Sequence, residues 1–420
     1  IFEPSSVAVI GASEKEKSLG YILLSNILKS GYPGSVFPVN PNYDKVCGLS
    51  SFPAVDKIGQ PVDMAVIATP ISTVPDILNQ CARAGVYGVI IISAGGKESG
   101  AKGLDIEESI KRQAHKAGIR VIGPNCLGIV CSRSRLNATF ANHAPLPGRL
   151  ALISQSGAIC SAVLDLSLKE QIGFSHFISV GSMLDVDFGD LIDYLGNDPA
   201  VRSIILYIES LNNFRKFMSA ARAVSRLKPI LALKAGKSAA GALAAASHTG
   251  ALAGEDSVYD AAFERAGIIR VDSIEELFDC AELLAKQPRP RGSRLAIVTN
   301  AGGPGVMAAD ALAAYNLQPA VLAPETLAQL DNILPSFWSH GNPIDLLGDA
   351  TSERYQKAVE VCILAREIDA LLITLAPLAV TNPTDIAQTL APYLKKKPVP
   401  VFTCWMGGQD VDEGRQIFNH

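Results

Sequence analysis

Three times along the 420 residues, a short apolar segment runs directly into a turn of small residues that opens a helix. These openings lie at residues 7–13, 150–158 and 295–305. Gly11 precedes Ser154 by 143 residues, and Ser154 precedes Asn300 by 146 residues. Near-equal spacing of one supersecondary unit indicates a repeated domain. We therefore predict three consecutive domains of similar size.

Proline and glycine gather just before the second and third openings, at 145–148 and 287–292, where they punctuate a chain between domains. The predicted domains are 1–145, 146–288 and 289–420. In each of them, apolar segments of strand length alternate with amphipathic segments of helical periodicity, which indicates βαβ units. The expected fold class is α/β, with three consecutive doubly wound parallel sheets. Such sheets bind ligands at the carboxyl ends of their strands.

The expected elements follow from this alternation. Strands are expected near 7–10, 35–39, 63–68, 87–93 and 119–122, then 150–153, 174–179, 202–208 and 229–233, then 294–298, 369–374 and 399–403. Helices are expected near 18–30, 73–84 and 104–117, then 157–169, 188–195, 213–226, 255–266 and 274–285, then 305–315, 352–366 and 383–394.

Composition excludes several classes of function. The net charge of -4 provides no basic field for nucleic acid or an anionic membrane, and no apolar run reaches the length of a membrane span. The 8 cysteines show no C-x-x-C pair and no histidine at zinc-ligand spacing, so we expect reduced core thiols, no metal site and a cytoplasmic protein. The chain begins Ile-Phe-Glu-Pro without a Met or a signal-peptide pattern, and we expect both ends to be trimmed.

The first turn, Gly11-Ala12-Ser13, can offer backbone N–H groups and a helix N-terminus to a phosphate. The dinucleotide fingerprint is incomplete, because the next glycine is Gly20 and the second strand ends in Val39-Asn40-Pro41-Asn42 without a ribose-binding acid. A nicotinamide cofactor is therefore disfavoured. Lys15, Lys17 and Lys45 are suited to a nucleotide with an additional phosphate, such as coenzyme A.

Small residues follow the later strands of the first domain. They are Thr69 and Pro70, then Ser93, Ala94 and Gly95, then Asn125 and Cys126 after Gly123-Pro124. They leave room for a thin, extended ligand that forms hydrogen bonds. Ordinary strand-end turns have the same composition, so this alternative stays open.

The second domain places one histidine, His248, after Ser247 and a run rich in glycine and alanine at 236–246. Such an arm packs poorly but suits a group that moves between sites. Glu209 ends an apolar strand, and its carboxylate could accept one ring N–H of the histidine. The second opening, Ser154-Gln155-Ser156-Gly157-Ala158, could hold a phosphoryl group at a helix N-terminus.

The segment Ser247-His248-Thr249-Gly250-Ala251 resembles the phosphohistidine loop of NDP-forming acyl-CoA synthetases, which include ADP-forming acetate–CoA ligase and the alpha subunit of succinyl-CoA synthetase. The resemblance covers the whole chain in order. The first domain resembles the Rossmann-like CoA-binding domain of that family, and the other two resemble its flavodoxin-like ligase domains. In the third, Asn300, Gly302 and Gly303 would form a second phosphate clamp, and 342–351 also resembles the family.

The resemblance implies that a small carboxylic acid, CoA and ATP are converted to acyl-CoA, ADP and phosphate. His248 would carry the phosphoryl group and Glu209 would orient it. It also implies an ATP-grasp module that binds ATP or ADP with Mg and that is a domain or subunit outside these residues. We expect the protein to be an oligomer. The same three domains resemble the N-terminal region of Pat-type protein lysine acetyltransferases, where a GNAT domain follows. An acyl-CoA sensor is therefore the alternative function.

Overall fold

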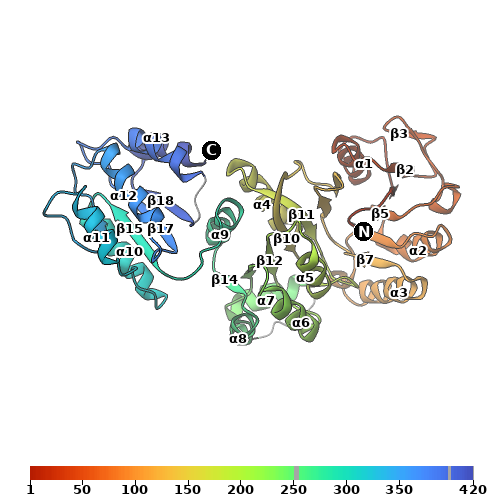
Figure 1. Cartoon of the computed structure of the whole chain (residues 1–420). Coiled ribbons are helices and arrows are strands. Elements are labelled where there is room, and N and C mark those ends of the chain that lie inside the picture. Colours follow the sequence, from red (N-terminus) through yellow and green to blue (C-terminus); the bar gives the residue numbers. More distant parts are fainter. Residues whose placement is uncertain (250–254, 396–398, 420) are drawn as a thin grey trace. The chain divides into compact units, whose positions relative to one another are not determined.

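A computed structural model describes residues 1–249, 255–395 and 399–419, with side chains over the same ranges except 245–249 and 419. The chain divides into two compact units, residues 1–285 and 286–420. Figure 1 shows the first unit in red to green and the second in blue tones. The predicted α/β class with mostly parallel sheets is confirmed: the first unit holds two large sheets and the second holds one.

The first sheet has the strand order β2-β1-β5-β6-β7, and all of its pairs are parallel. Its strands are Ser6–Ile10 (β1), Ser35–Val39 (β2), Met64–Ile67 (β5), Gly88–Ile91 (β6) and Arg120–Ile122 (β7). The connections are Leu19–Lys29 (α1), the hairpin Lys45–Val46 (β3) with Leu49–Ser50 (β4), Val55–Lys57 (η1), Ile71–Thr73 (η2), Val74–Arg83 (α2), Lys97–Ser99 (η3) and Ala101–Ala117 (α3).

Alternate residues of these strands enter two different cores, as the period of a strand requires. Val7 and Val9 pack with the buried leucines of α1, whereas Ala8 and Ile10 pack with α2 and α3. The sheet is therefore covered by helices on both faces, which explains why its strands are continuous apolar runs.

The second sheet has the order β14-β13-β12-β10-β11-β8-β9. Its strands are Gly128–Cys131 (β8), Leu136–Thr139 (β9), Leu146–Ser154 (β10), Gly173–Ser179 (β11), Ser203–Ile208 (β12), Ile230–Lys234 (β13) and Ile269–Val271 (β14). Its helices are Gly157–Lys169 (α4), Phe188–Asn197 (α5), Phe214–Val224 (α6), Ala239–Thr249 (α7), Asp256–Ala266 (α8) and Ile274–Lys286 (α9).

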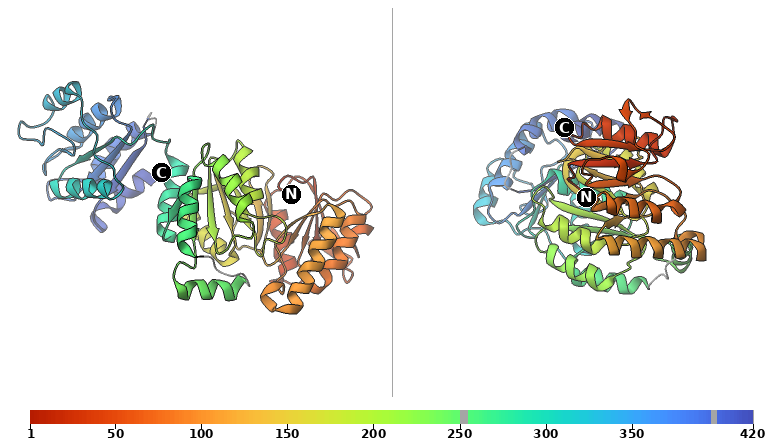
Figure 2. Two further views of the ribbon diagram at one scale, coloured as in Figure 1. Left: turned by 90° about the horizontal axis from the view of Figure 1, so that it is seen from below. Right: turned by 90° about the vertical axis from the view of Figure 1, so that its right-hand side faces the viewer.

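The β8–β9 hairpin was not predicted. It lies within residues 1–145, yet β8 pairs antiparallel with β11 of the second sheet. One hydrophobic core accordingly runs without a break from α1, through the hairpin, to α5 and α6. Figure 2 shows the two sheets of this unit side by side, in red to orange and in yellow to green.

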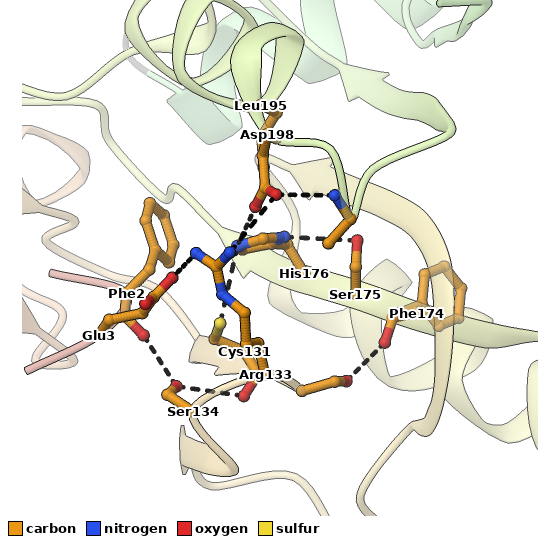
Figure 3. A network of polar contacts seen from close by, with 12 residues as sticks. Phe2, Glu3, Cys131, Arg133, Ser134, Phe174, Ser175, His176, Leu195 and Asp198 are labelled. Carbon is orange, nitrogen blue, oxygen red and sulfur yellow. Dashed lines mark hydrogen bonds and ion pairs between the residues drawn. The ribbon is translucent and has the colours of Figure 1, made fainter.

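A polar network around the buried His176 ties the hairpin to β11 (Figure 3). His176 of β11 is 1% exposed, and its Nε2 atom lies 3.7 Å from Asp198 Oδ2 and 3.7 Å from Cys131 Sγ. Arg133, in the turn of the hairpin, forms ion pairs with Asp198 and Glu3. Burial lowers the pKa of His176 to about 4, against the opposing attraction of Asp198.

The second unit contains a parallel sheet of order β16-β15-β17-β18. Its strands are Leu295–Thr299 (β15), Ile344–Asp345 (β16), Ala370–Leu375 (β17) and Val401–Trp405 (β18). Its helices are Gly302–Ala314 (α10), Pro324–Asp331 (α11), Ser352–Leu364 (α12), Pro383–Leu394 (α13), Gln409–Val411 (η4) and Asp412–Asn419 (α14).

No helix was predicted in the run before His248, whereas the structure assigns residues 239–249 to the helix α7. Alanine supplies most of this segment and has the highest helix propensity. Ser238 caps the helix, because its Oγ atom accepts a hydrogen bond from Gly241 N at 3.1 Å. Among the described residues, every helix falls short of the length and apolar character that crossing a bilayer requires.

Candidate functional site

The strand order of the first sheet reverses between β1 and β5, and parallel sheets bind ligands at the carboxyl ends of the strands at such a point. Gly11 adopts a φ of +90°, and a Cβ added there would lie 3.0 Å from Thr69 Cγ2. A Cβ added to Gly20 of α1 would lie 1.9 Å from the Gly11 carbonyl oxygen. These two glycines bring the helix start and the strand-end turns close together, as phosphate-binding turns require.

Asn40 fixes the turn after β2 against the turn after β1. Its Nδ2 atom donates to the Ala12 carbonyl at 2.7 Å, and its Oδ1 atom accepts from Asn42 N at 2.9 Å. Pro41 between them is exposed. In the first turn, the Ser13 hydroxyl accepts a hydrogen bond from Lys15 N at 3.0 Å, so it stabilises the loop that leads into α1.

Two of the predicted cations lie in loops near the turn after β1. Lys17 and Lys45 are exposed, and Lys45 is part of the β3–β4 hairpin. The hairpin contacts the first turn, because Cys47 N donates to Glu14 Oε1 at 2.5 Å. The structure therefore brings Lys17 and Lys45 to neighbouring loops at one end of the sheet.

The turns after β5, β6 and β7 are joined by hydrogen bonds. The Ser93 hydroxyl donates to the Thr69 carbonyl, and Asn125 N donates to the Ser93 carbonyl at 2.9 Å. Cys126 differs from its neighbours, because it is buried and its thiol donates to the Ile91 carbonyl at 3.3 Å. Because the side chain packs inside the sheet, burial raises the pKa of this thiol to about 12. The other predicted residues here, Pro70, Ala94 and Gly95, lie in these turns.

The turn after β10 is closed by a serine. The Ser154 hydroxyl donates to the Ser156 carbonyl at 2.9 Å and accepts from Ser156 N at 3.1 Å. Ser156 then caps α4 by accepting from Ile159 N at 3.3 Å. Gly157 and Ala158 form the first turn of α4, where backbone N–H groups lack helical partners.

Gln155 connects this turn to the end of β12. Its Oε1 atom accepts hydrogen bonds from Glu209 N at 2.6 Å and Ser210 N at 2.9 Å. Its Nε2 atom donates to Ser210 Oγ at 3.3 Å. The buried amide of Gln155 thereby fixes the backbone that carries Glu209, whose side chain is half-buried.

The strand ends of the first and second sheets meet at one small cavity. Its volume is about 30 Å³, and it is lined by Lys97, Glu98, Asn125, Gln155, Gly181, Ser182 and Glu209. The helix α7 lies against η3 at this place. His248 belongs to α7, but its side chain lies outside the described residues. The structure thus brings Asn125, Gln155 and Glu209 together.

The turn after β15 in the third sheet repeats the hydrogen bonds of the turn after β10 in the second. The Thr299 hydroxyl donates to the Ala301 carbonyl at 2.8 Å and accepts from Ala301 N at 3.1 Å. Asn300 takes the position of Gln155, since its side chain accepts from Ala376 N at 2.8 Å and donates to the Ala376 carbonyl at 2.9 Å. Gly302 and Gly303 are exposed in the first turn of α10.

Four residues of the cavity were not predicted, namely Lys97, Glu98, Gly181 and Ser182. Gly181 has a recognisable reason: a Cβ added there would lie 2.1 Å from the Pro124 carbonyl oxygen and 2.4 Å from that of Asn125. The glycine lets the turn after β11 pack on the turn after β7. Its sequence signal is a glycine directly after an apolar strand.

Three family models match consecutive parts of the chain. A CoA binding domain matches residues 5–132, a succinyl-CoA ligase like flavodoxin domain matches 147–284, and a Ligase-CoA domain matches 295–416.

Two curated relatives match nearly the full chain. The ADP-forming acetate–CoA ligase II subunit alpha of Pyrococcus furiosus is 40% identical over 99% of the chain and 91% of its own length. The ADP-forming acetate–CoA ligase I of Archaeoglobus fulgidus is also 40% identical over 99% of the chain, which spans 59% of that protein.

A solved structure has the same fold. It is the dinucleotide forming acetyl-coenzyme A synthetase 1 of Ca. Korarchaeum cryptofilum, in complex with phosphate and ADP. The two chains share 37% sequence identity and superpose with a TM-score of 0.95 over 100% of this chain and 90% of the other. By sequence, domain order and fold, the chain belongs to the NDP-forming acyl-CoA synthetase family, which includes ADP-forming acetate–CoA ligase.

Proposed function

We propose that the chain is the acyl-transferring core of an ADP-forming acid–thiol ligase. The reaction interconverts a carboxylic acid, CoA and ATP with acyl-CoA, ADP and phosphate, through a phosphohistidine on His248. The acid is small, with acetate as the default because relatives are named for it. The observation that supports this most is the cavity at which Asn125 of the CoA-binding half meets Gln155 and Glu209, beside the helix that carries His248.

Coenzyme A fits the first sheet by its chemistry. The turns at Gly11 and Thr69 offer close backbone approach for a pyrophosphate, and exposed Lys17 and Lys45 offer charge for a further phosphate. The turns after β5, β6 and β7 then lead to the cavity, which would receive the thiol end of the ligand.

Glu209 is the orienting acid in this proposal. The Gln155 side chain accepts hydrogen bonds from the backbone N–H groups of Glu209 and Ser210. These bonds hold the backbone from which the Glu209 carboxylate extends at the end of β12. An ionised carboxylate that accepts one ring N–H leaves the other ring nitrogen as the nucleophile for phosphorus. The α4 N-terminus at Gly157 and Ala158 would receive the phosphoryl group on His248.

The α10 N-terminus, with Gly302 and Gly303 and the Asn300 turn, is the second proposed clamp. The side chain of Asn300 is used within its sheet, so only backbone groups of that turn remain for a phosphate. Mg-bound ATP or ADP would be held by an ATP-grasp module, which is a separate subunit or an adjoining domain.

The test supplies an ATP-grasp subunit from a relative together with ATP. Wild type should acquire an acid-labile, base-stable phosphate label, and His248→Asn should lose the label while it still binds CoA. ADP release in the presence of acetate and CoA should require the added subunit. If no ADP were released with or without the subunit while CoA still bound, the result would contradict the ligase proposal and favour an acyl-CoA-sensing role.

A further inference from the structure

The turn that carries Lys97 is built to hold its backbone in one place. Lys97 N donates to Glu107 Oε1 of α3 at 3.0 Å, and Glu107 is only 6% exposed. A Cβ added to Gly96 would lie 2.1 Å from the same Glu107 oxygen, so a larger residue there would have to displace the carboxylate that holds Lys97 N. Gly95 N donates to Glu98 Oε1 at 2.7 Å, which closes the turn. These contacts hold in one position the backbone from which the Lys97 side chain extends.

The Lys97 side chain lines the cavity between the first and second sheets. Its ammonium group donates to the Ser182 carbonyl at 3.4 Å, near the limit of a hydrogen bond. Within residues 1–249 and the other described ranges, none of the ion pairs found involves Lys97. An ammonium group has three donors, so this one retains capacity for an acceptor in the cavity.

Three other polar groups of the cavity, Gln155, Glu98 and Glu209, are less suited to that task. Gln155 already uses both ends of its amide on the residues after β12. Glu98 and Glu209 are carboxylates and would repel a free anion. One cation beside two carboxylates therefore selects a dipolar acceptor rather than a whole carboxylate or phosphate.

The size of the cavity agrees with this selection. A volume of about 30 Å³ holds one or two groups the size of a water molecule. A carbonyl oxygen fits that space, whereas a phosphoryl group with its oxygens would have to remain outside it.

We infer that Lys97 binds the acyl carbonyl oxygen and stabilises the oxyanion that forms there during acyl transfer. This rests on the proposed ligase function and adds a catalytic residue to it. In the step towards acyl-CoA, the CoA sulfur attacks the carbonyl carbon of the acyl phosphate. The C–S bond forms, the C–O bond to phosphorus-bound oxygen breaks, and phosphate leaves with that electron pair, while the thiol proton passes to solvent. Lys97 holds the negative charge that rests on the carbonyl oxygen in between.

The first test uses this chain alone with acetyl-CoA labelled with ¹³C at the carbonyl carbon. Binding to wild type should move the carbonyl resonance downfield, because the ammonium group polarises the bond. Lys97→Met should bind CoA with unchanged affinity and lack the shift, and Lys97→Arg should restore part of it. An equal shift in Lys97→Met, or no shift in wild type that binds the ligand, would overturn the inference. Failure to bind CoA at all would instead overturn the CoA assignment in the proposed function.

The second test measures turnover with an added ATP-grasp subunit. Lys97→Met should lower kcat for acyl-CoA formation by about 10²- to 10³-fold, the usual loss for one oxyanion donor. Labelling of His248 from ATP should be unchanged, because that step involves no acyl group. The control is Lys102→Met, an exposed lysine on α3, which should keep full kcat. Equal kcat in Lys97→Met and the control would refute the assignment.

Discussion

Acid should destabilise the first unit through one buried histidine. His176 is 1% exposed and faces Asp198, Cys131, Arg133 and Tyr194, and burial lowers its pKa from 6.5 to about 4. Between these two pH values the unfolded chain binds more protons than the folded chain, so stability rises with pH there. The contribution of His176 is fully present above pH 6.5 and is lost as the pH falls towards 4.

The magnitude follows from the depressed pKa. One pKa unit corresponds to about 1.36 kcal/mol, so a shift of about 2.5 units gives at most roughly 3.4 kcal/mol in strong acid. At pH 5, which is 1.5 units below the unfolded value, the loss is about 2 kcal/mol. This is a large part of the ~5–15 kcal/mol by which a folded domain is stable.

The perturbation is His176→Gln, which cannot be protonated in this range. At pH 8 it should cost about 1 kcal/mol, because the edge contact with Phe2, at 5.2 Å between ring centroids, is lost. Between pH 8 and pH 5 wild type should lose about 2 kcal/mol more stability than the variant. The control is His115→Gln on the exposed face of α3, which should follow wild type.

The assay must report on the first unit. Both tryptophans, Trp338 and Trp405, belong to the second unit, so their fluorescence is unsuitable. Pulsed hydrogen exchange along a urea series, read by mass spectrometry on peptides from β11, measures the correct transition. If His176→Gln lost as much stability as wild type at pH 5, the buried ring would not be the source of acid sensitivity.

Three further substitutions test the site and its support. Lys45→Ala should weaken CoA binding more than dephospho-CoA binding, as measured by calorimetry, whereas equal weakening would move the phosphate contact elsewhere, for example to Lys17. Glu209→Gln should preserve CoA binding and lower His248 phosphorylation by about 10²-fold or more in a radiolabel assay, and full activity would leave Glu209 no orienting role. Gly181→Ala should lower the free energy of unfolding by about 2 to 4 kcal/mol, because its φ is +54° and its Cβ would meet the Pro124 carbonyl at 2.1 Å. Gly303→Ala, in open space, is the matched control and should change stability little.

The sequence predicted the parallel sheets well because their strands are buried on both faces. Such strands are continuous apolar runs between turn residues, and α4 and α13 were predicted at 157–169 and 383–394, the bounds that the structure gives. Helix starts were less well predicted. The helix expected from 305 begins at Gly302, since glycines give a weak propensity signal at a position that tertiary contacts decide.

The site was predicted in part for a similar reason. Gln155 directly follows β10 and Glu209 directly follows β12. Because these two strands are neighbours in the sheet, the proximity of the two residues follows from the topology. Lys97 lies in a turn like many others, and only the contacts of this turn with Glu107 and Glu98 show that its backbone is held in place. The β8–β9 hairpin was not predicted because its two short strands are joined by a turn, whereas the expected βαβ pattern links strands through helices.

That hairpin determines where the chain could be divided by gene fission or by an engineer. A cut at 145/146 would separate β8 and β9 from β11, expose an apolar strand edge and open a core shared by both halves. A cut at 285/286 follows the boundary between the two compact units and leaves every sheet intact. Exchange of parts between relatives should therefore succeed at the second position, so that the CoA-binding sheet and its neighbour are inherited as one piece.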